Sequence, residues 1–287
     1  MVSNLPQHEE YLRKKRNKKI LRWSVTALLF ISMVSLVSYI SHRGRIRIAN
    51  VELSGGILVT RQEVELKSLD FMQGSYLFLF PKNSAFWYPK NKLENYLKEN
   101  FKRIDTINIS RKDFQTISVD ITERKPVAMW CDKLPSDNLG YTSPDLMEDG
   151  SLQENCYFMD QNSTIFAPAP EFSGDAYFKY YGIVSSDPIG KEYIASTTEF
   201  ADLANFVSVA KTLGIHPLYL SAKDSGDFSL FIAGGGQIYF DVKEPLSKVS
   251  QNLASLLGAP ALKVNGNISV EYIDLRFGNK LFYKLKQ

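Results

Sequence analysis

One stretch near the start of the sequence is apolar over enough residues to cross a membrane. Residues 20–40 contain a single charged side chain, Arg22. A helix rises about 1.5 Å per residue, so about 20 residues cover the hydrocarbon core of a bilayer. Trp23 and Tyr39 lie near the two ends, where aromatic residues favour the membrane–water interface. The segment therefore predicts a single transmembrane helix over residues 20–41.

Basic residues flank this segment unequally. The dense cluster at 13–19 precedes it, and a sparser set that includes Arg43, Arg45 and Arg47 follows it. Short flanks rich in Lys and Arg stay on the cytoplasmic side. Residues 1–19 are therefore predicted to form a basic cytoplasmic tail of a single-pass membrane protein, with the bulk of the chain outside the cytoplasm.

A cleaved signal peptide is the main alternative for the same segment, because it also has a basic start and an apolar centre. Three features favour the anchor. The apolar stretch exceeds the roughly 7 to 15 residues usual for a signal, no Ala-x-Ala-like site closes it, and strand-like sequence resumes at 45–48.

The rest of the composition is that of an ordinary globular chain. The 287 residues are 44% hydrophobic and 23% charged, with a net charge of +3, which allows one or two domains beyond the anchor. Much of the basic excess lies in the tail, where it faces anionic lipid headgroups. We therefore expect contact with membrane lipid and no nucleic-acid partner.

The only two cysteines, Cys131 and Cys156, both follow the predicted anchor and thus lie in a potentially oxidising compartment. Cys131 ends an apolar run over 126–131, and Cys156 opens another over 156–160. If these runs pair as antiparallel strands, the two thiols lie close together and a disulfide is favoured. Two small buried thiols remain the alternative.

Residues 45–130 show the order strand, helix, helix, strand, strand. A first strand near 48–53 ends at a Gly pair, and Thr60 with Glu63 has the spacing of a capping box at a helix start. A second helix is predicted from about Asn91. Alternating apolar and polar residues over 106–110 and 116–122 then indicate a half-buried hairpin.

This order, the preceding anchor and the closing segment Glu-Arg-Lys-Pro-Val-Ala at 123–128 resemble the POTRA domain of the FtsQ/DivIB cell-division family, whose signature ends in Glu-Arg-x-Pro-x-Ala. An aromatic insert at 76–89 departs from the family pattern, as does a hairpin turn without Pro. Two interpretations of the insert stay open. It contacts lipid headgroups or a partner, or its rings cover the core of the domain.

Residues 131–287 alternate short strands with two amphipathic helices, one after Ser196 and one over about 245–257. The last segment, 267–284, resembles the terminal strands of the FtsQ β domain. There Ile273, Leu275 and Phe277 are expected on one face, and Tyr272, Asp274 and Arg276 on the other. The predicted fold class is α+β: a single transmembrane helix, a POTRA domain (β-α-α-β-β), and a mainly antiparallel β domain with two packed helices.

No catalytic, cofactor-binding or metal-binding residues are predicted, and we expect no enzyme and no small-molecule substrate. Of three histidines, only His216 lies within a predicted folded domain, so no nucleophile pair or multi-His metal site is easily built. Ser-x-x-Lys at 208–211 and Ser-Asp-Asn at 136–138 match motifs of penicillin-binding enzymes. Their order is reversed and Lys-Thr-Gly is absent, so we interpret both as coincidence.

The resemblance implies a non-enzymatic bitopic scaffold of the bacterial division machinery, located in the bacterial cell (inner) membrane and acting in septum formation at the division site. Its partners would be FtsB-like and FtsL-like bitopic proteins that bind the C-terminal strands. The candidate partner-binding residues are Tyr272, Asp274, Arg276, Phe277, Asn279 and Tyr283. Asp274 and Arg276 have an alternative interpretation, as a pair across a solvated sheet face. The alternative function is a POTRA-containing protein-transport or envelope-assembly receptor, although such proteins usually carry several POTRA repeats or a membrane barrel.

Overall fold

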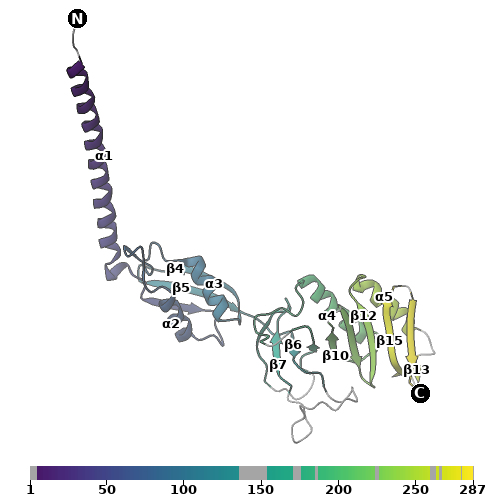
Figure 1. The fold of residues 1–287 in the computed structure, drawn as a ribbon. Coiled ribbons are helices and arrows are strands. Elements are labelled where there is room, and N and C mark those ends of the chain that lie inside the picture. The colour runs from purple at the N-terminus through teal and green to yellow at the C-terminus, as the bar shows by residue number, and fades with distance from the viewer. Residues whose placement is uncertain are drawn as a thin grey trace, which may run out of the picture. The chain divides into compact units, whose positions relative to one another are not determined.

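The computed structural model describes residues 5–135, 154–170, 176–184, 187–223, 226–258, 263–264, 267–278 and 280–286. It is a mixed α+β structure that divides into two compact units, Met1–Glu123 and Arg124–Gln287. A long N-terminal helix opens the first unit, and a large sheet dominates the second (Figure 1).

The N-terminal helix α1 spans Leu5–Ser41, followed by a 3-10 turn at Gly44–Ile46. The part over Tyr11–Ser41 is long and apolar enough to cross a membrane, and its most apolar stretch is not buried against the rest of the chain. The expected span 20–41 is therefore confirmed as helix. The basic cluster at 13–19 belongs to the same continuous helix.

The rest of the first unit has the predicted order strand, helix, helix, strand, strand, with one small extra hairpin. Its sheet has the order β1-β5-β4, in which β1 is parallel and β4 antiparallel to the central β5. The extra hairpin, β2–β3, comes from the aromatic insert. The bounds are β1 (Asn50–Ser54), α2 (Arg61–Phe71), β2 (Ser75–Tyr76), β3 (Phe80–Pro81), α3 (Lys90–Asn100), β4 (Ile104–Arg111) and β5 (Thr116–Glu123).

Local sequence signals account for these elements. Thr60 and Glu63 form the predicted capping box at the start of α2, since each side chain bonds the other's backbone N–H. On α3, Leu93 and Leu97 lie one turn apart and are fully buried. Alternate residues of the strands complete a single core, formed chiefly by Ile48, Val51, Val64, Leu93, Leu97, Ile104, Ile109, Ile117 and Val119.

The last residue of β5 holds the loop between β1 and α2. One carboxylate oxygen of Glu123 accepts hydrogen bonds from the backbone N–H groups of Ile57, Leu58 and Val59, at 2.7, 2.8 and 2.9 Å. Burial alone would raise the pKa of Glu123, but these three donors outweigh it and hold the pKa below its ordinary value. The Glu of the Glu-Arg-x-Pro-x-Ala segment therefore has a structural role.

Replacing Glu123 by Gln is expected to lower the free energy of unfolding of the first unit by about 1 kcal/mol at pH 7, because charged acceptors form stronger hydrogen bonds. The folded pKa lies below the unfolded one. The contribution of the carboxylate is therefore complete above the unfolded pKa and is lost as the pH falls through the folded one. Thermal unfolding from pH 7 downward measures both effects. Glu52→Gln, at an exposed ion pair with Lys112, is the control, and equal losses in the two variants would contradict the assignment.

Within its described residues, the second unit contains one nine-stranded mixed sheet, a separate two-stranded piece (β13, β14) and two helices. The strand order is β16-β15-β12-β11-β10-β9-β6-β7-β8. The pairs β6–β9, β9–β10 and β12–β15 are parallel, and the other neighbours are antiparallel. The bounds are β6 (Ala128–Cys131), β7 (Cys156–Met159), β8 (Ile165–Pro168), β9 (Lys179–Tyr181), α4 (Thr197–Thr212), β10 (Pro217–Ala222), β11 (Asp227–Ile232), β12 (Gly236–Asp241), α5 (Leu246–Leu257), β13 (Lys263–Val264), β14 (Asn267–Ile268), β15 (Val270–Phe277) and β16 (Lys280–Leu285).

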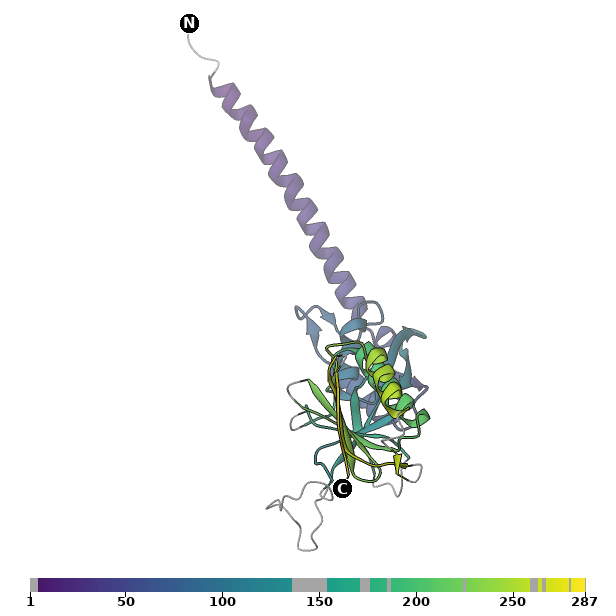
Figure 2. The same cartoon turned by 90° about the vertical axis from the view of Figure 1, so that its right-hand side faces the viewer.

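Helices α4 and α5 cover one face of this sheet, as the turned view shows (Figure 2). Their apolar stripes follow the predicted spacing, and both helices were expected from the sequence. The main core lies between the helices and the sheet. It includes Phe200, Leu203, Phe206 and Val207 of α4, Leu246, Val249 and Leu253 of α5, and Leu220, Leu230, Ile238, Phe240, Ile273 and Leu275 of the strands.

The boundary between the two units falls before the expected division between residues 130 and 131. Strand β6 pairs with β7 and β9 and so belongs to the sheet of the second unit, and the division follows Glu123. Arg124 forms an ion pair with the buried Asp160 of the same unit. The second unit thus begins at Arg124. Most of the loop expected between the two cysteines lies outside the described residues.

Candidate functional site

The candidate residues cluster at the last two strands, β15 and β16. β16 is an edge strand, and in the part of the chain that the structure describes it pairs only with β15. Most of its side chains are exposed, including Phe282 at 50% and Tyr283 at 44%. An edge of this kind presents unpaired backbone N–H and C=O groups to another chain.

The opposite edge of the sheet is partly covered by the chain itself. Ile165 of β8 donates its N–H to the carbonyl oxygen of Lys191 at 2.9 Å and accepts from the N–H of Gly190 at 2.6 Å. Thr164 and Glu192 form a further bridge. Among the residues that the structure describes, the two edges therefore differ, and β16 is the more accessible of the two for strand addition.

The pairing register assigns the candidates to the two faces of the sheet. Ile273 lies opposite Ile238 and both are fully buried on the helix-covered face. Tyr272 and Asp274 lie on the other face, where Asp274 is opposite Tyr239 of β12. We call this second face, which α4 and α5 do not cover, the open face. The expected alternation of Tyr272 and Asp274 against Ile273 and Leu275 is confirmed.

Phe277 departs from that alternation. It was expected on the same face as Ile273 and Leu275, but it is 55% exposed and its ring packs edge-on against Phe282, with 5.2 Å between ring centroids. Phe282 lies opposite Asp274 in the register, hence on the open face. The pairing of β15 with β16 shifts between Asp274 and Phe277. This irregularity turns the Phe277 ring toward the open face.

Arg276 links three strands on the open face. Its Nε and Nη2 donate to the two carboxylate oxygens of Asp274 at 2.9 and 2.6 Å, and its Nη1 donates to Asp227 of β11 at 3.1 Å. The guanidinium carbon also lies 5.4 Å from the centre of the Tyr239 ring. The Arg276 guanidinium therefore bridges the carboxylates of Asp274 and Asp227.

The pKa shifts follow from this bridge. The Asp274 side chain raises the pKa of Arg276 above its ordinary value, against the effect of burial. Burial alone would raise the pKa of Asp274, but its hydrogen bonds with Arg276 hold that pKa below its ordinary value. Asp274 is only 8% exposed. The pair is thus a charged, partly buried unit at neutral pH that stabilises the end of the sheet.

The six candidates differ in what they can offer a partner. Phe277 is exposed on the open face, and Tyr283 is exposed on the opposite face, since it pairs with Ile273. Tyr272 is half-buried against Tyr239, with ring centroids 6.0 Å apart. The side chains of Asp274 and Arg276 are hydrogen-bonded to each other. Asn279 lies outside the described residues.

Sequence reasoning missed three residues that contact Arg276 or Phe277: Asp227, Tyr239 and Phe282. Asp227 and Tyr239 belong to β11 and β12, far from Arg276 in the sequence, and no local pattern points to their meeting. Phe282 could have been predicted, because alternation along β16 assigns it to the face opposite that of Tyr283. We define the edge surface as β16 together with the exposed or half-buried side chains beside it: Tyr239, Tyr272, Arg276, Phe277, Phe282, Tyr283 and Lys284.

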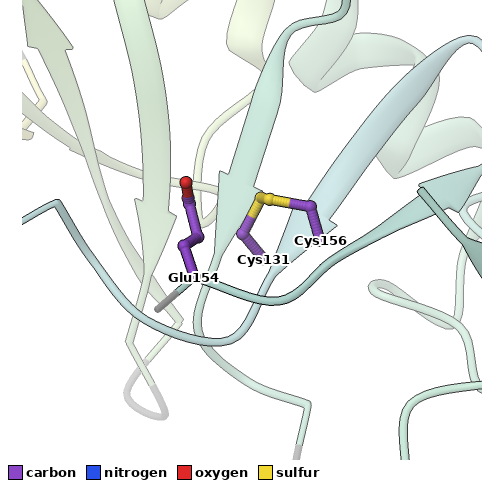
Figure 3. Close-up of side chains that lie close together, drawn as sticks. All are labelled: Cys131, Glu154 and Cys156. Atoms are coloured by element: carbon purple, nitrogen blue, oxygen red, sulfur yellow. A yellow bond between two sulfur atoms is a disulfide. The ribbon is translucent and has the colours of Figure 1, made fainter. Parts of the chain in front are cut away.

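A second cluster lies at the start of β7. Cys131 and Cys156 are opposite each other on β6 and β7 and form a disulfide, with the Glu154 side chain beside it (Figure 3). Two cysteines and a carboxylate resemble a metal-ligand set. Both sulfurs are used in the disulfide, however, and Glu154 accepts hydrogen bonds from Lys179 at 2.8 Å and from the Tyr181 hydroxyl. We therefore interpret the cluster as a structural cross-link.

The structure describes only one of the two segments that match motifs of penicillin-binding enzymes. Ser208 and Lys211 lie on the exposed side of α4, and the Ser-Asp-Asn sequence at 136–138 lies outside the described residues.

Comparison with known proteins identifies no family for this chain. No family model matches the sequence, and no curated protein is significantly similar to it.

Proposed function

We propose that this protein is a non-enzymatic, single-pass membrane scaffold of the bacterial division machinery, and that it holds partner proteins through its second unit. The division role rests on the resemblance of residues 45–130 and 267–284 to the FtsQ/DivIB family. The mode of action rests on one structural observation, the edge strand β16, whose outer side no described residue pairs with and which has exposed aromatic side chains on both faces. The proposed partners are FtsB-like and FtsL-like bitopic proteins.

Strand addition is the binding mode that suits this edge. A partner segment in extended conformation would pair its backbone with the outer side of β16, which supplies affinity without regard to sequence. Selectivity would come from side chains on the two faces. Phe277 and Phe282 contact the partner's residues on the open face, and Tyr283 contacts those on the other.

The side-chain part of this proposal is tested by replacing Phe277 and Tyr283 with Ser, singly and together, in the full-length protein. Both side chains are exposed, so little stability is lost, whereas removing aromatic contacts at an interface typically costs more than about 1 kcal/mol of binding free energy each. We expect the double variant to retain less than about a tenth of the FtsB-like and FtsL-like proteins in co-purification.

Leu218→Ser is the matched control, because Leu218 of β10 is 46% exposed in the same unit and away from β16. It should retain the partners as the wild type does. Undiminished retention by a folded Phe277→Ser/Tyr283→Ser variant would remove the edge surface from the proposal.

The division role is tested separately by imaging a fluorescent fusion of the full chain in dividing cells. Enrichment at midcell supports a division scaffold. Uniform staining of the envelope would contradict it and favour the receptor for protein transport or envelope assembly, which also binds extended client strands.

A further inference from the structure

The β2–β3 hairpin exposes two large apolar side chains at its turn. Leu77 is 84% and Phe78 is 97% exposed. Both have a left-handed backbone, with φ of 49° and 62°, which is uncommon for residues other than Gly. These two side chains do not cover the core of the domain. Tyr88, at the other end of the insert, does pack against that core, so the insert has two parts with different roles.

The hairpin lies against the C-terminal end of α1. The Ser38 hydroxyl donates a hydrogen bond to the carbonyl oxygen of Leu79 at 2.6 Å. Val34, Val37 and Ser38 are half-buried and Ser41 is 2% exposed, which marks one face of the last two helical turns. Ser38 precedes the end of the helix by about 4.5 Å along the axis. The hairpin therefore reaches back alongside the apolar helix.

Backbone pairing holds the insert in this position. Ile48 donates its N–H to the carbonyl oxygen of Asn83 at 2.8 Å, and Ala85 donates to that of Ile46 at 3.0 Å. Arg47 and Ser84 form a β-bridge between these two bonds. The segment that leaves α1 is thus paired directly with the insert, and the hairpin is fixed to the helix exit at two places.

We propose that the hairpin tip, Leu77 and Phe78, inserts into the lipid bilayer beside α1. The inference requires that α1 spans a membrane and does not depend on the division role. Ser38 precedes Tyr39 in the helix and is hydrogen-bonded to Leu79. A bilayer that surrounds α1 up to Tyr39 therefore also reaches the level of Leu79. The two exposed apolar side chains then leave water for the acyl boundary.

The surroundings of the hairpin suit the membrane interface. Phe86 and Trp87 are 54% and 42% exposed, and interfacial positions favour such rings. Arg43 and Arg45 follow the helix and are exposed, where they can meet lipid phosphates. The occupant that best fits an apolar tip with aromatic and basic neighbours, next to a membrane helix, is the lipid bilayer itself.

Depth-dependent quenching tests this proposal on the full-length chain in lipid nanodiscs of phosphatidylcholine and phosphatidylglycerol. The native cysteines are joined in a disulfide, so Phe78→Cys supplies one thiol for an environment-sensitive fluorophore when no reductant is added. Ile57→Cys is the matched control, since Ile57 is 87% exposed and follows the end of β1 that is farther from α1. Phe30→Cys in the middle of α1 reports whether the helix is in the bilayer.

We expect lipids spin-labelled near the headgroup to quench the probe at 78 at least about twofold more than the probe at 57, as burial about 5–10 Å into the boundary requires. Equal quenching at 78 and 57, with position 30 quenched by deep spin labels, would overturn the proposal and leave the anchor intact. Absence of quenching at position 30 would overturn both the proposed insertion of the hairpin tip and the assignment of α1 as a membrane anchor. A photocrosslinker at 78 that captures a protein rather than lipid in cells would also overturn it.

Discussion

Loss of the disulfide between Cys131 and Cys156 is expected to lower the free energy of unfolding of the second unit by about 3 kcal/mol. The bond closes a loop with a sequence separation of 25 residues, and the chain-entropy model gives an effect of this size for such a loop. It also joins β6 to β7, the third and second strands from the β8 edge of the sheet. Denaturant unfolding with and without reductant measures the difference.

The Cys131→Ser/Cys156→Ser variant is the control for this experiment. It should unfold like the reduced wild-type protein and show no response to reductant. The first unit contains neither cysteine, so its own unfolding transition should stay unchanged. Two titratable thiols in the unreduced, denatured protein would show that the bond is absent.

The second large effect is expected at the Arg276 bridge. Arg276→Met should destabilise the second unit by about 2 kcal/mol at pH 7, because it leaves the buried Asp274 carboxylate without its partner. The partial exposure of Arg276 keeps the loss below that of a fully buried pair. Replacing Asp274 by Asn in addition removes the unpaired charge. The double variant should therefore be more stable than Arg276→Met alone.

The pH dependence gives an independent measure of the same bridge. In the wild type, the pKa of Asp274 is held below its ordinary value. The pair therefore stabilises the fold above the unfolded pKa of about 3.9 and loses this contribution as the pH falls through the folded pKa. In Arg276→Met, burial without a cation should raise the pKa of Asp274. The difference in the free energy of unfolding between wild type and variant should then become smaller from pH 7 toward pH 4. A difference that stays constant with pH would contradict the assignment.

The local elements of this fold were predictable because their signals lie within a few residues. The capping residues Thr60 and Ser196 located the starts of α2 and α4, and strict alternation located β4 and β5. In each case, one side of the helix or strand must be buried, so apolar residues recur along the sequence with the period of that element.

The long-range pairings were not predictable by the same reasoning. Strand β15 pairs in parallel with β12, and nothing within β15 specifies this neighbour. The contact of Arg276 with Asp227 spans 49 residues of sequence. The turn of Phe277 toward the open face depends on a register shift with β16. Such features arise from pairing geometry, which a single sequence does not display.

The contact of the β2–β3 hairpin with α1 also limits how a second membrane helix can pack against this one. Val34, Val37, Ser38 and Ser41 form the covered face of the last two turns. Helix packing needs a free face at i, i+3 and i+4 spacing. Near its C-terminal end, α1 therefore offers a neighbouring helix the opposite side, which carries Leu29, Ser32 and Leu36. If another membrane helix packs against this end of α1, the hairpin restricts it to that opposite side.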